Sequence, residues 1–288
     1  MSVKLISDSA CDLTQSEANE LDVTILPLKI RIDGAEYLDG VTITQDEFYK
    51  KVASSKRFPV TRPVTPAQFT DALKPMLEAG DDVVIITISE KFSNTAKNAA
   101  IAAYRLGGNV WIVDSGSATI GQNILLRYAI RLRDRGVSAR QIVGELERAK
   151  VHIRLLVKVD TLKYLMLGGH ISRPAVLAGT LMRLKPVLKV ANGEVELLGK
   201  ARGTQQINEI LTKSIQKVGD IDFSMPAMVA YSGEPTVLKE YLDSSKALWE
   251  GKEDSLLTTR IGSTICTHAG LGTVAVAFFS NEYRLYHW

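Results

Sequence analysis

The chain has 288 residues and a mass of 31.6 kDa, a length that predicts about two domains. Hydrophobic residues make up 45% and charged residues 23%, so a disordered or collagen-like chain is excluded. The net charge of +3 is too small to indicate nucleic-acid binding, and two cysteines make neither a disulfide framework nor a structural zinc site. We expect a globular protein that needs no metal, cofactor or disulfide.

The first residues lack the apolar core of a signal peptide, and no apolar run approaches the ~20 residues that cross a bilayer. The two cysteines, Cys11 and Cys266, lie far apart in the sequence, which favours a reducing compartment. We therefore expect a cytoplasmic protein.

The first half of the chain alternates short apolar runs with helical segments. Helix starts are predicted at Thr14, Thr44, Thr65 and Ser138, where capping residues or a following proline occur. The remaining predicted elements are the strands Val3–Ile6, Val23–Ile32, Val83–Ile88 and Val110–Val113, and the helices Ala96–Leu106 and Ile124–Arg135. This alternation predicts a three-layer α/β domain with a parallel sheet over residues 1–155.

The second half is less regular, and Asn192-Gly193 within it is a strong hairpin signal. The predicted strands are Ile153–Val159, Pro186–Val190, Glu194–Leu198, Met228–Tyr231, Leu256–Ile261 and Thr273–Phe279. The predicted helices are Thr161–Leu167, Pro174–Leu184, Gln205–Val218 and Thr236–Trp249. Hairpins combined with helices predict a smaller α+β domain with a mixed sheet over residues 156–288.

Small polar residues follow three of the predicted N-terminal strands. They are Ser7-Asp8-Ser9, Ser93-Asn94-Thr95 and Asp114-Ser115-Gly116-Ser117. Backbone amides at a helix start are unpaired and attract an anion, and a hydroxyl beside them adds a donor. These clusters could bind a carboxylate or phosphate, although each taken alone is more simply explained as a helix cap.

Two further clusters are Thr61-Arg62-Pro63-Val64-Thr65-Pro66 and the glycine-rich stretch Ile261–Gly272. His268 in the second cluster either donates to a carboxylate or is an ordinary loop histidine. On an extended strand Cys266 and His268 would share a face, but no third group that would orient a thiol nucleophile is evident. The chain has neither a G-x-x-x-x-G-K-[ST] loop nor a G-x-G-x-x-G motif, so nucleotide binding has no signature.

Taken together, these clusters resemble the DegV family of bacterial fatty-acid-binding proteins. The matching stretches occur in family order and are Ser7–Leu13, Thr61–Pro66, Ser89–Thr95, Val113–Ser115, Leu165–Ser172, Leu184–Pro186, Gly199–Gly203 and Ile261–His268. The resemblance implies a two-domain fold that buries an acyl chain. It also implies a partner fatty acid kinase, which uses ATP to convert the bound carboxylate to an acyl phosphate for phospholipid synthesis.

The resemblance also implies roles for individual residues. Thr61, Ser93 and His268 would hold the carboxylate, and the amide of Asn94 would face it. Arg62 stands where the family usually has serine and puts a charge beside the head-group site.

Three other positions depart from the family pattern: Asn94 replaces a glycine, His170 an arginine and Leu271 a proline. Arg173 and Arg202 belong to a basic group that is either a solvated face or a surface for the kinase or an anionic membrane. The expected tunnel lining, for which plain core packing is the simpler explanation, is Ala175, Val176, Leu177, Ala178 and Leu181.

The leading hypothesis is a carrier that binds a long-chain fatty acid and presents its carboxylate to a separate kinase. One alternative is a hydrolase or phosphotransferase that uses Asp8, Ser93 and His268. Another is a regulatory protein that responds to bound lipid.

Overall fold

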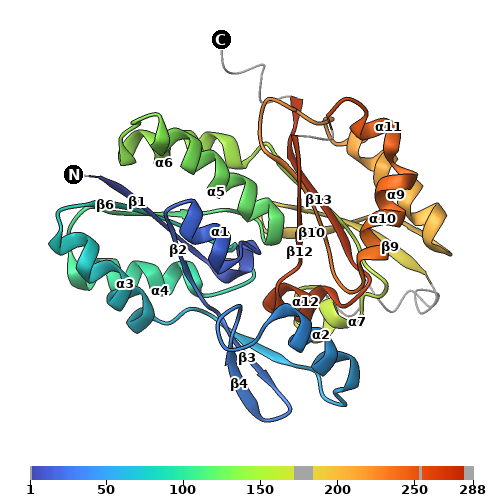
Figure 1. Cartoon of the computed structure of the whole chain (residues 1–288), viewed down its shortest axis with the longest axis horizontal. Coiled ribbons are helices and arrows are strands. Elements are labelled where there is room, and N and C mark those ends of the chain that lie inside the picture. The colour runs from blue at the N-terminus through green and yellow to red at the C-terminus, as the bar shows by residue number, and fades with distance from the viewer. Residues whose placement is uncertain (1, 172–183, 253–254, 282–288) are drawn as a thin grey trace.

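The computed structural model of the chain describes residues 2–171, 184–252 and 255–281, and all structural statements concern these residues. They form three β-sheets (Figure 1). The two larger sheets lie side by side, and the small third sheet lies below their junction in that view.

The first sheet is parallel throughout, with the strand order β2-β1-β6-β7. Its strands are β1 (Val3–Asp8), β2 (Val23–Leu26), β6 (Asp82–Thr87) and β7 (Val110–Asp114). One face carries α3 (Pro66–Glu78) and α4 (Thr95–Leu106), and the other carries α5 (Thr119–Asp134) and α6 (Ala139–Lys150). The short helices η1 (Ser9–Cys11) and α1 (Gln15–Glu20) follow β1. The predicted three-layer arrangement is confirmed.

The second sheet is mixed, with the order β10-β9-β8-β13-β11-β12 and a single parallel pair, β11 with β12. Its strands are β8 (Ile153–Lys158), β9 (Lys185–Ala191), β10 (Glu194–Ala201), β11 (Ala227–Tyr231), β12 (Leu256–Arg260) and β13 (Val274–Phe279). Its outer face packs against α9 (Thr204–Lys217) and α10 (Pro235–Ser244), beside α11 (Lys246–Trp249). The predicted mixed sheet is therefore confirmed as well.

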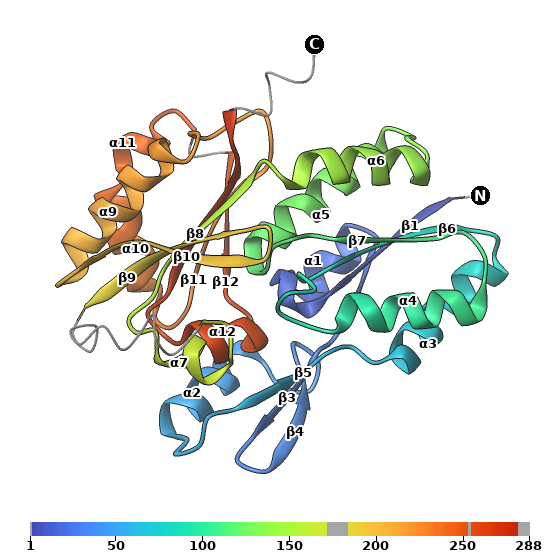
Figure 2. The same ribbon diagram turned by 180° about the vertical axis from the view of Figure 1, so that it is seen from behind.

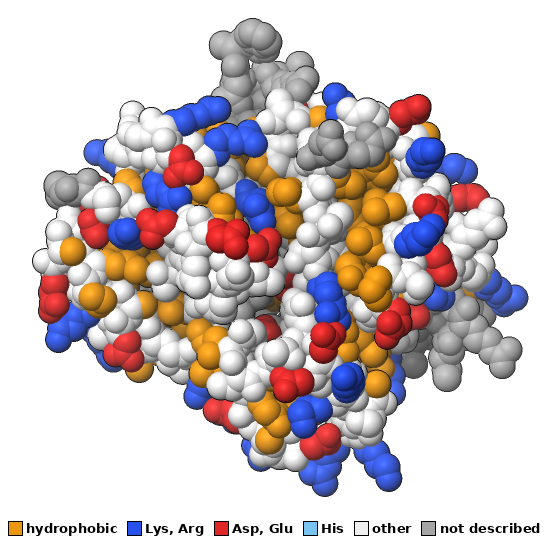
Figure 3. Space-filling view, in the orientation of Figure 1, with side chains coloured by type: hydrophobic (Ala, Val, Ile, Leu, Met, Phe, Trp, Pro, Cys, Tyr) orange, Lys and Arg blue, Asp and Glu red, His pale blue; other side chains and the backbone are white. Residues whose placement is uncertain are grey.

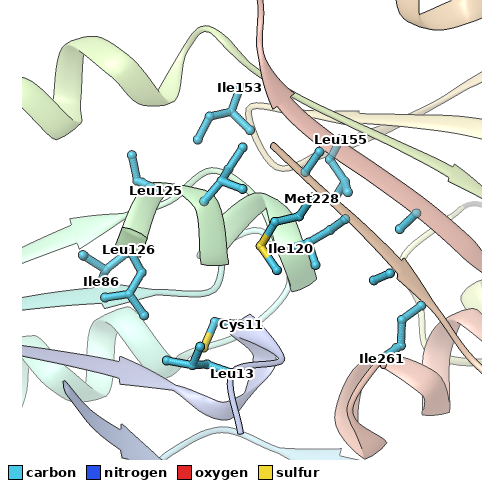
Figure 4. Close-up of a cluster of buried hydrophobic side chains, with 14 of the residues drawn as sticks. Cys11, Leu13, Ile86, Ile120, Leu125, Leu126, Ile153, Leu155, Met228 and Ile261 are labelled. Carbon is cyan, nitrogen blue, oxygen red and sulfur yellow. The ribbon is translucent and has the colours of Figure 1, made fainter. Parts of the chain in front are cut away.

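Helix α5 packs between the two large sheets. Ile120 and Leu125 on this helix belong to the same buried cluster as Ile86 of the first sheet and Leu155 and Met228 of the second (Figure 4). One continuous core therefore joins the two halves. The predicted division near residue 155 falls within β8, and the independence of the two parts stays a prediction.

The third sheet is a small antiparallel unit that was not predicted from the sequence. It has the order β4-β3-β5, with β3 (Lys29–Ile32), β4 (Ala35–Leu38) and β5 (Val60–Arg62). Helices α2 (Gln45–Ser54) and α12 (Ser263–Ala269) pack beside it, and α7 (Lys163–Leu167) lies against α12 (Figure 2). This corner brings together segments from both ends of the chain.

Two sequence predictions were wrong in detail. The run Val23–Ile32 is split into β2 and β3, which belong to different sheets, because Pro27 has no amide hydrogen with which to continue a ladder. Residues near His268 were considered as extended strand, but Ser263–Ala269 is helical. The predicted helix Pro174–Leu184 lies almost entirely outside the described residues.

Acidic and basic side chains are interspersed over the face of the molecule in Figure 3. That face has no large region of one sign. Within the described residues, no helix combines the length and the apolar character needed to cross a bilayer.

Candidate functional site

A cavity of about 240 Å³ lies where the carboxyl ends of the first sheet meet the second sheet. Leu28, Ile88 and Ala118 line it from segments that follow strands of the first sheet. The turn of the β9–β10 hairpin closes this junction, because the amide of Gly193 donates to the carbonyl of Gly116 at 2.7 Å. Such a junction at the carboxyl ends of parallel strands is a common place for a ligand.

The wall that the second sheet contributes is apolar. Leu155 and Val157 on β8, Leu188 and Val190 on β9, and Ala275 on β13 line the cavity. Alternate residues of a strand share one face, so this spacing directs one row of side chains into the cavity and the other row under α9 and α10. A cavity with such walls suits a hydrocarbon ligand.

Two residues from distant parts of the chain form a polar pair in the cavity wall. The hydroxyl of Thr61 on β5 lies 2.9 Å from Nε2 of His268 on α12. Burial is the main cause that lowers the pKa of His268 to about 3, and the nearby His170 contributes in the same direction. The His268 ring is therefore neutral at pH 7.

A second imidazole packs against the first. The ring centroids of His170 and His268 are 4.5 Å apart and the rings are nearly perpendicular, while Phe92 makes a similar contact with His170 at 5.4 Å. Burial also lowers the pKa of His170. A Cβ atom on Gly168 would lie 2.2 Å from Nδ1 of His268, so only glycine fits beneath this ring.

Ser93 and Asn94 complete the polar part of the wall at the start of α4. The Ser93 hydroxyl lies 2.8 Å from that of Thr95 and accepts the amide of Thr95. Asn94 occupies the N-cap position, but its side chain makes no capping hydrogen bond, and its amide bonds to no other described residue. The helix start therefore has donors available for an anion.

Arg62 is the only lysine, arginine, aspartate or glutamate among the described residues that line the cavity. Its side chain is exposed, and Arg62 pairs with Lys29 across the small sheet, whereas the neighbouring Thr61 pairs with the buried Ile30. Successive side chains of a strand point to opposite faces. The alternation therefore places Arg62 and Thr61 on opposite faces of the sheet, and Arg62 borders the cavity as an exposed residue.

Buried carboxylates hold α12 in place. Asp39 accepts the amides of Ser263 and Thr264 at 3.1 Å each, and Asp12 accepts the amide of Gly262 at 2.9 Å. Burial is the largest cause that raises the pKa of Asp12 to about 8, and it also raises the pKa of Asp39. These acids support the helix that carries His268, and neither lines the cavity.

The structure brings Thr61, Arg62, Ser93, Asn94 and His268 to the wall of one cavity. His170 joins them through its contact with His268, although no binding role was predicted for it.

Two predicted residues lie away from this cavity wall. Asp8 is fully buried, with its carboxylate bonded to the amides of Ile88 and Ala10, and Arg202 is exposed at the end of β10. The remaining predictions, Arg173, Ala175, Val176, Leu177, Ala178 and Leu181, lie outside the described residues. The sheet residues of the wall were missed, although the apolar alternation in β8 and β9 could have indicated them.

The suggested pairing of Cys266 with His268 is wrong, because residues two apart on a helix point in different directions. Cys266 is 1% exposed, and burial raises its pKa above the ordinary range. A buried thiol of this kind is inert.

Comparison with known proteins agrees with this architecture. The DegV family model, described as "Uncharacterised protein, DegV family", matches residues 2–281. This chain belongs to the DegV family. A DegV domain-containing protein of Deinococcus radiodurans is 32% identical over 281 residues, which cover 96% of this chain and 98% of the relative.

Two solved DegV-fold structures cover nearly all of the chain. One, described as fatty acid binding of a DegV family protein from Thermus thermophilus, has a TM-score of 0.83 and 31% identity, and covers 97% of this chain and 100% of its own. The other, a stearic acid-binding protein from Eubacterium ventriosum, has a TM-score of 0.86 and 27% identity. The match covers 99% of this chain and 100% of the other chain. DegV proteins of this fold are thus described as binding fatty acids.

Proposed function

We propose that this DegV protein binds a long-chain fatty acid in the cavity and presents its carboxylate to a separate fatty acid kinase. The observation that carries the proposal is one apolar cavity with a polar wall formed by Thr61, Ser93, Asn94 and His268. The hydrocarbon tail would lie against β8, β9 and β13, and the carboxylate would lie against the hydroxyls and the Asn94 amide.

The tail supplies most of the affinity in this proposal. Burial contributes about 0.8 kcal/mol per methylene, so 14 methylenes give a gross term on the order of 11 kcal/mol before the costs of binding. A hydrogen bond contributes only about 0.5–1.5 kcal/mol net between neutral groups, and about 1.5–3 kcal/mol to a charged acceptor. The polar residues therefore orient the carboxylate.

Presentation to a kinase is supported by the exposure of the polar wall. Asn94 is exposed and Thr61 is half-buried, so the head group would lie near the surface while the tail is enclosed. No nucleotide-binding loop occurs in the chain, so the phosphoryl donor would come with the partner. The enzyme alternative has less support, because Asp8 does not line the cavity.

Organic extraction of the purified protein, followed by mass spectrometry, tests the binding proposal. We expect about one long-chain fatty acid per chain. Ala275→Leu adds methylenes to the cavity wall and should shift the bound lipid towards shorter chains. Ala100→Leu on the exposed side of α4 is the matched control and should leave the lipid unchanged. A lipid-free protein that also fails to take up added palmitate would refute the proposal.

The kinase step is tested separately with a DegV-associated fatty acid kinase and ATP. The loaded protein should support formation of an acyl phosphate, whereas the lipid-free protein should not. Lipid binding without any kinase response would favour the regulatory alternative.

A further inference from the structure

The cavity places two neutral imidazoles where the proposed ligand carries a negative charge, and the one fixed charge among the described lining residues is the exposed Arg62. Carboxylic acids have ordinary pKa values near about 4, so a fatty acid in water is ionised at pH 7. Moving an ionised carboxylate into an apolar cavity is costly unless it is paired. A compensating charge beside the buried side of the head group would offset this cost.

The hydrogen bonding of His268 identifies an atom that can accept a proton. Its Nε2 is paired with Thr61, whereas its Nδ1 is buried and has no partner among the described residues. A buried N–H without an acceptor is rarer in proteins than an under-satisfied acceptor. The ring therefore carries its hydrogen on Nε2 and donates it to Thr61, which leaves Nδ1 as a free lone pair.

This tautomer has a useful consequence for the ligand. Because the oxygen of Thr61 accepts from His268, the Thr61 hydroxyl hydrogen is free to donate to a carboxylate oxygen. A proton bound by the imidazole pair would also make the Thr61 hydroxyl a stronger donor, because hydrogen bonds that involve an ionised group are stronger than those between neutral groups.

His170 extends the site to a pair. It lines the cavity and packs edge-to-face on His268, and the two rings are too close for both to hold a positive charge at little cost. The pair can therefore accept one proton, but a second would be opposed by the first.

The other titratable groups near α12 are occupied or directed elsewhere. Asp12 and Asp39 accept amides at the helix start, and the Tyr49 hydroxyl donates to the carbonyl of Ile261. The remaining groups on the elements packed against the pair are Cys11, Lys29, Arg31, Asp46, Glu47, Lys50, Lys51, Arg62, Lys91, Lys163, Tyr164 and Cys266. Lys29, Arg31 and Arg62 lie on the outer face of the small sheet, and Lys91 lies beside Gly193.

We propose that the carboxylate binds together with one proton from solution, which the His170–His268 pair holds. This inference rests on the fatty-acid function proposed above. The balance is simple: one hydrogen ion leaves the buffer and joins a neutral imidazole, and no covalent bond of the ligand is formed or broken. The product is an imidazolium that stabilises the carboxylate through the Thr61 hydroxyl, and the carboxylate remains a nucleophile for phosphoryl transfer.

Isothermal titration of delipidated protein with palmitate, in buffers of different ionisation enthalpy at pH 7.5, counts the protons. The wild-type chain should take up about one proton per ligand. Its association constant should also fall about tenfold per pH unit over the range in which the free site is neutral. Proton uptake near zero with normal palmitate binding would overturn the inference but would not contradict the proposed fatty-acid function.

A fixed charge at the same position gives the sharpest comparison. His170→Arg supplies a permanent cation, so proton uptake should fall to near zero and the pH dependence should flatten while palmitate still binds. His152→Gln removes a histidine outside the cavity wall and should behave as wild type. An arginine variant that retains the full uptake would contradict the proposal.

Two further measurements keep the outcomes distinct. Should His170→Arg fail to fold, His268→Gln removes the ring bonded to Thr61 and should also lower the proton uptake. A chain that binds no palmitate at any pH and carries no lipid after purification would instead refute the fatty-acid function itself.

Discussion

Two polar regions of this DegV protein differ in how their groups are paired. In the first region, the carboxyl groups of Asp8 and Asp12 near the end of β1 and of Asp39 after β4 are buried and bonded to backbone amides. In the cavity wall, Nδ1 of His268 and the amide of Asn94 have no partner among the described residues. Both regions contain small polar residues that follow strands. The paired region stabilises the fold, and the unpaired region is available to a ligand.

The largest effect is expected from Asp39→Ala in the paired region. The substitution leaves two buried amides of α12 and the Ser9 hydroxyl without their acceptor. The cost should be about 3 kcal/mol or more in the free energy of unfolding. Chemical denaturation measures it, with the exposed Asp71→Ala as control. Equal stability of the two variants would show that the carboxylate network does not support the helix.

The pH dependence of stability sharpens the same comparison. The pKa of Asp12 is raised to about 8 and that of Asp8 to about 6, so between about pH 4 and pH 8 the folded state binds more protons than the unfolded state. Their contribution to stability is therefore lost as the pH rises through these values.

Each carboxyl group should lower the free energy of unfolding by at most about 1.4 kcal/mol per pH unit. Asp12→Asn keeps an oxygen for the Gly262 amide but cannot titrate, so it should flatten the slope. Denaturation midpoints at a series of pH values test this. A slope that is unchanged in the variant would contradict the assignment.

A smaller change in stability is expected in the cavity wall. Thr61→Val removes the hydroxyl but preserves the shape, and Thr61 is only half-buried, so stability should fall by about 1 kcal/mol or less. Ligand orientation should change more than stability, which a carbon-13 signal from labelled palmitate carboxylate can report. A loss of stability as large as that of Asp39→Ala would remove the contrast between the regions.

The smallest effect on stability and on total binding is expected for Ser93→Ala. Affinity for palmitate should fall by roughly tenfold, since one hydrogen bond to an ionised acceptor contributes about 1.5 kcal/mol or somewhat more. Acyl phosphate formation with the kinase should fall by a larger factor, because the carboxylate is misplaced. An equal loss in both assays would contradict the separate roles of tail and head group.

Local signals predicted much of the fold. The capping boxes at Thr14 and Thr44 and the hairpin at Asn192-Gly193 are all present, because each depends on residues a few positions apart. Helix α12 was missed, since its N-cap is Gly262 and the carboxylate that caps it is Asp39, more than two hundred residues away. A cap supplied from such a distance leaves no local pattern.

Local sequence patterns were also insufficient to predict the whole candidate site. Resemblance to the DegV family indicated Thr61, Ser93, Asn94 and His268, and all four line the cavity. The role of His170 depends on its distance from His268, which is nearly a hundred residues further along the chain. The cavity wall on β8 and β9 depends on which face of the second sheet is covered by helices, and that pairing is settled only in three dimensions.

The position of α5 between the sheets bears on how the proposed ligand would be exchanged. A hinge motion that separated the two large sheets would move Ile120 and Leu125 away from Leu155 and Met228. It would expose the hydrophobic core that the two halves share to water (Figure 4). Local displacement near Thr61 and Asn94 exposes far less apolar surface. The proposed ligand should therefore enter and leave through a small local displacement near Thr61 and Asn94, while the two large sheets and α5 keep their arrangement.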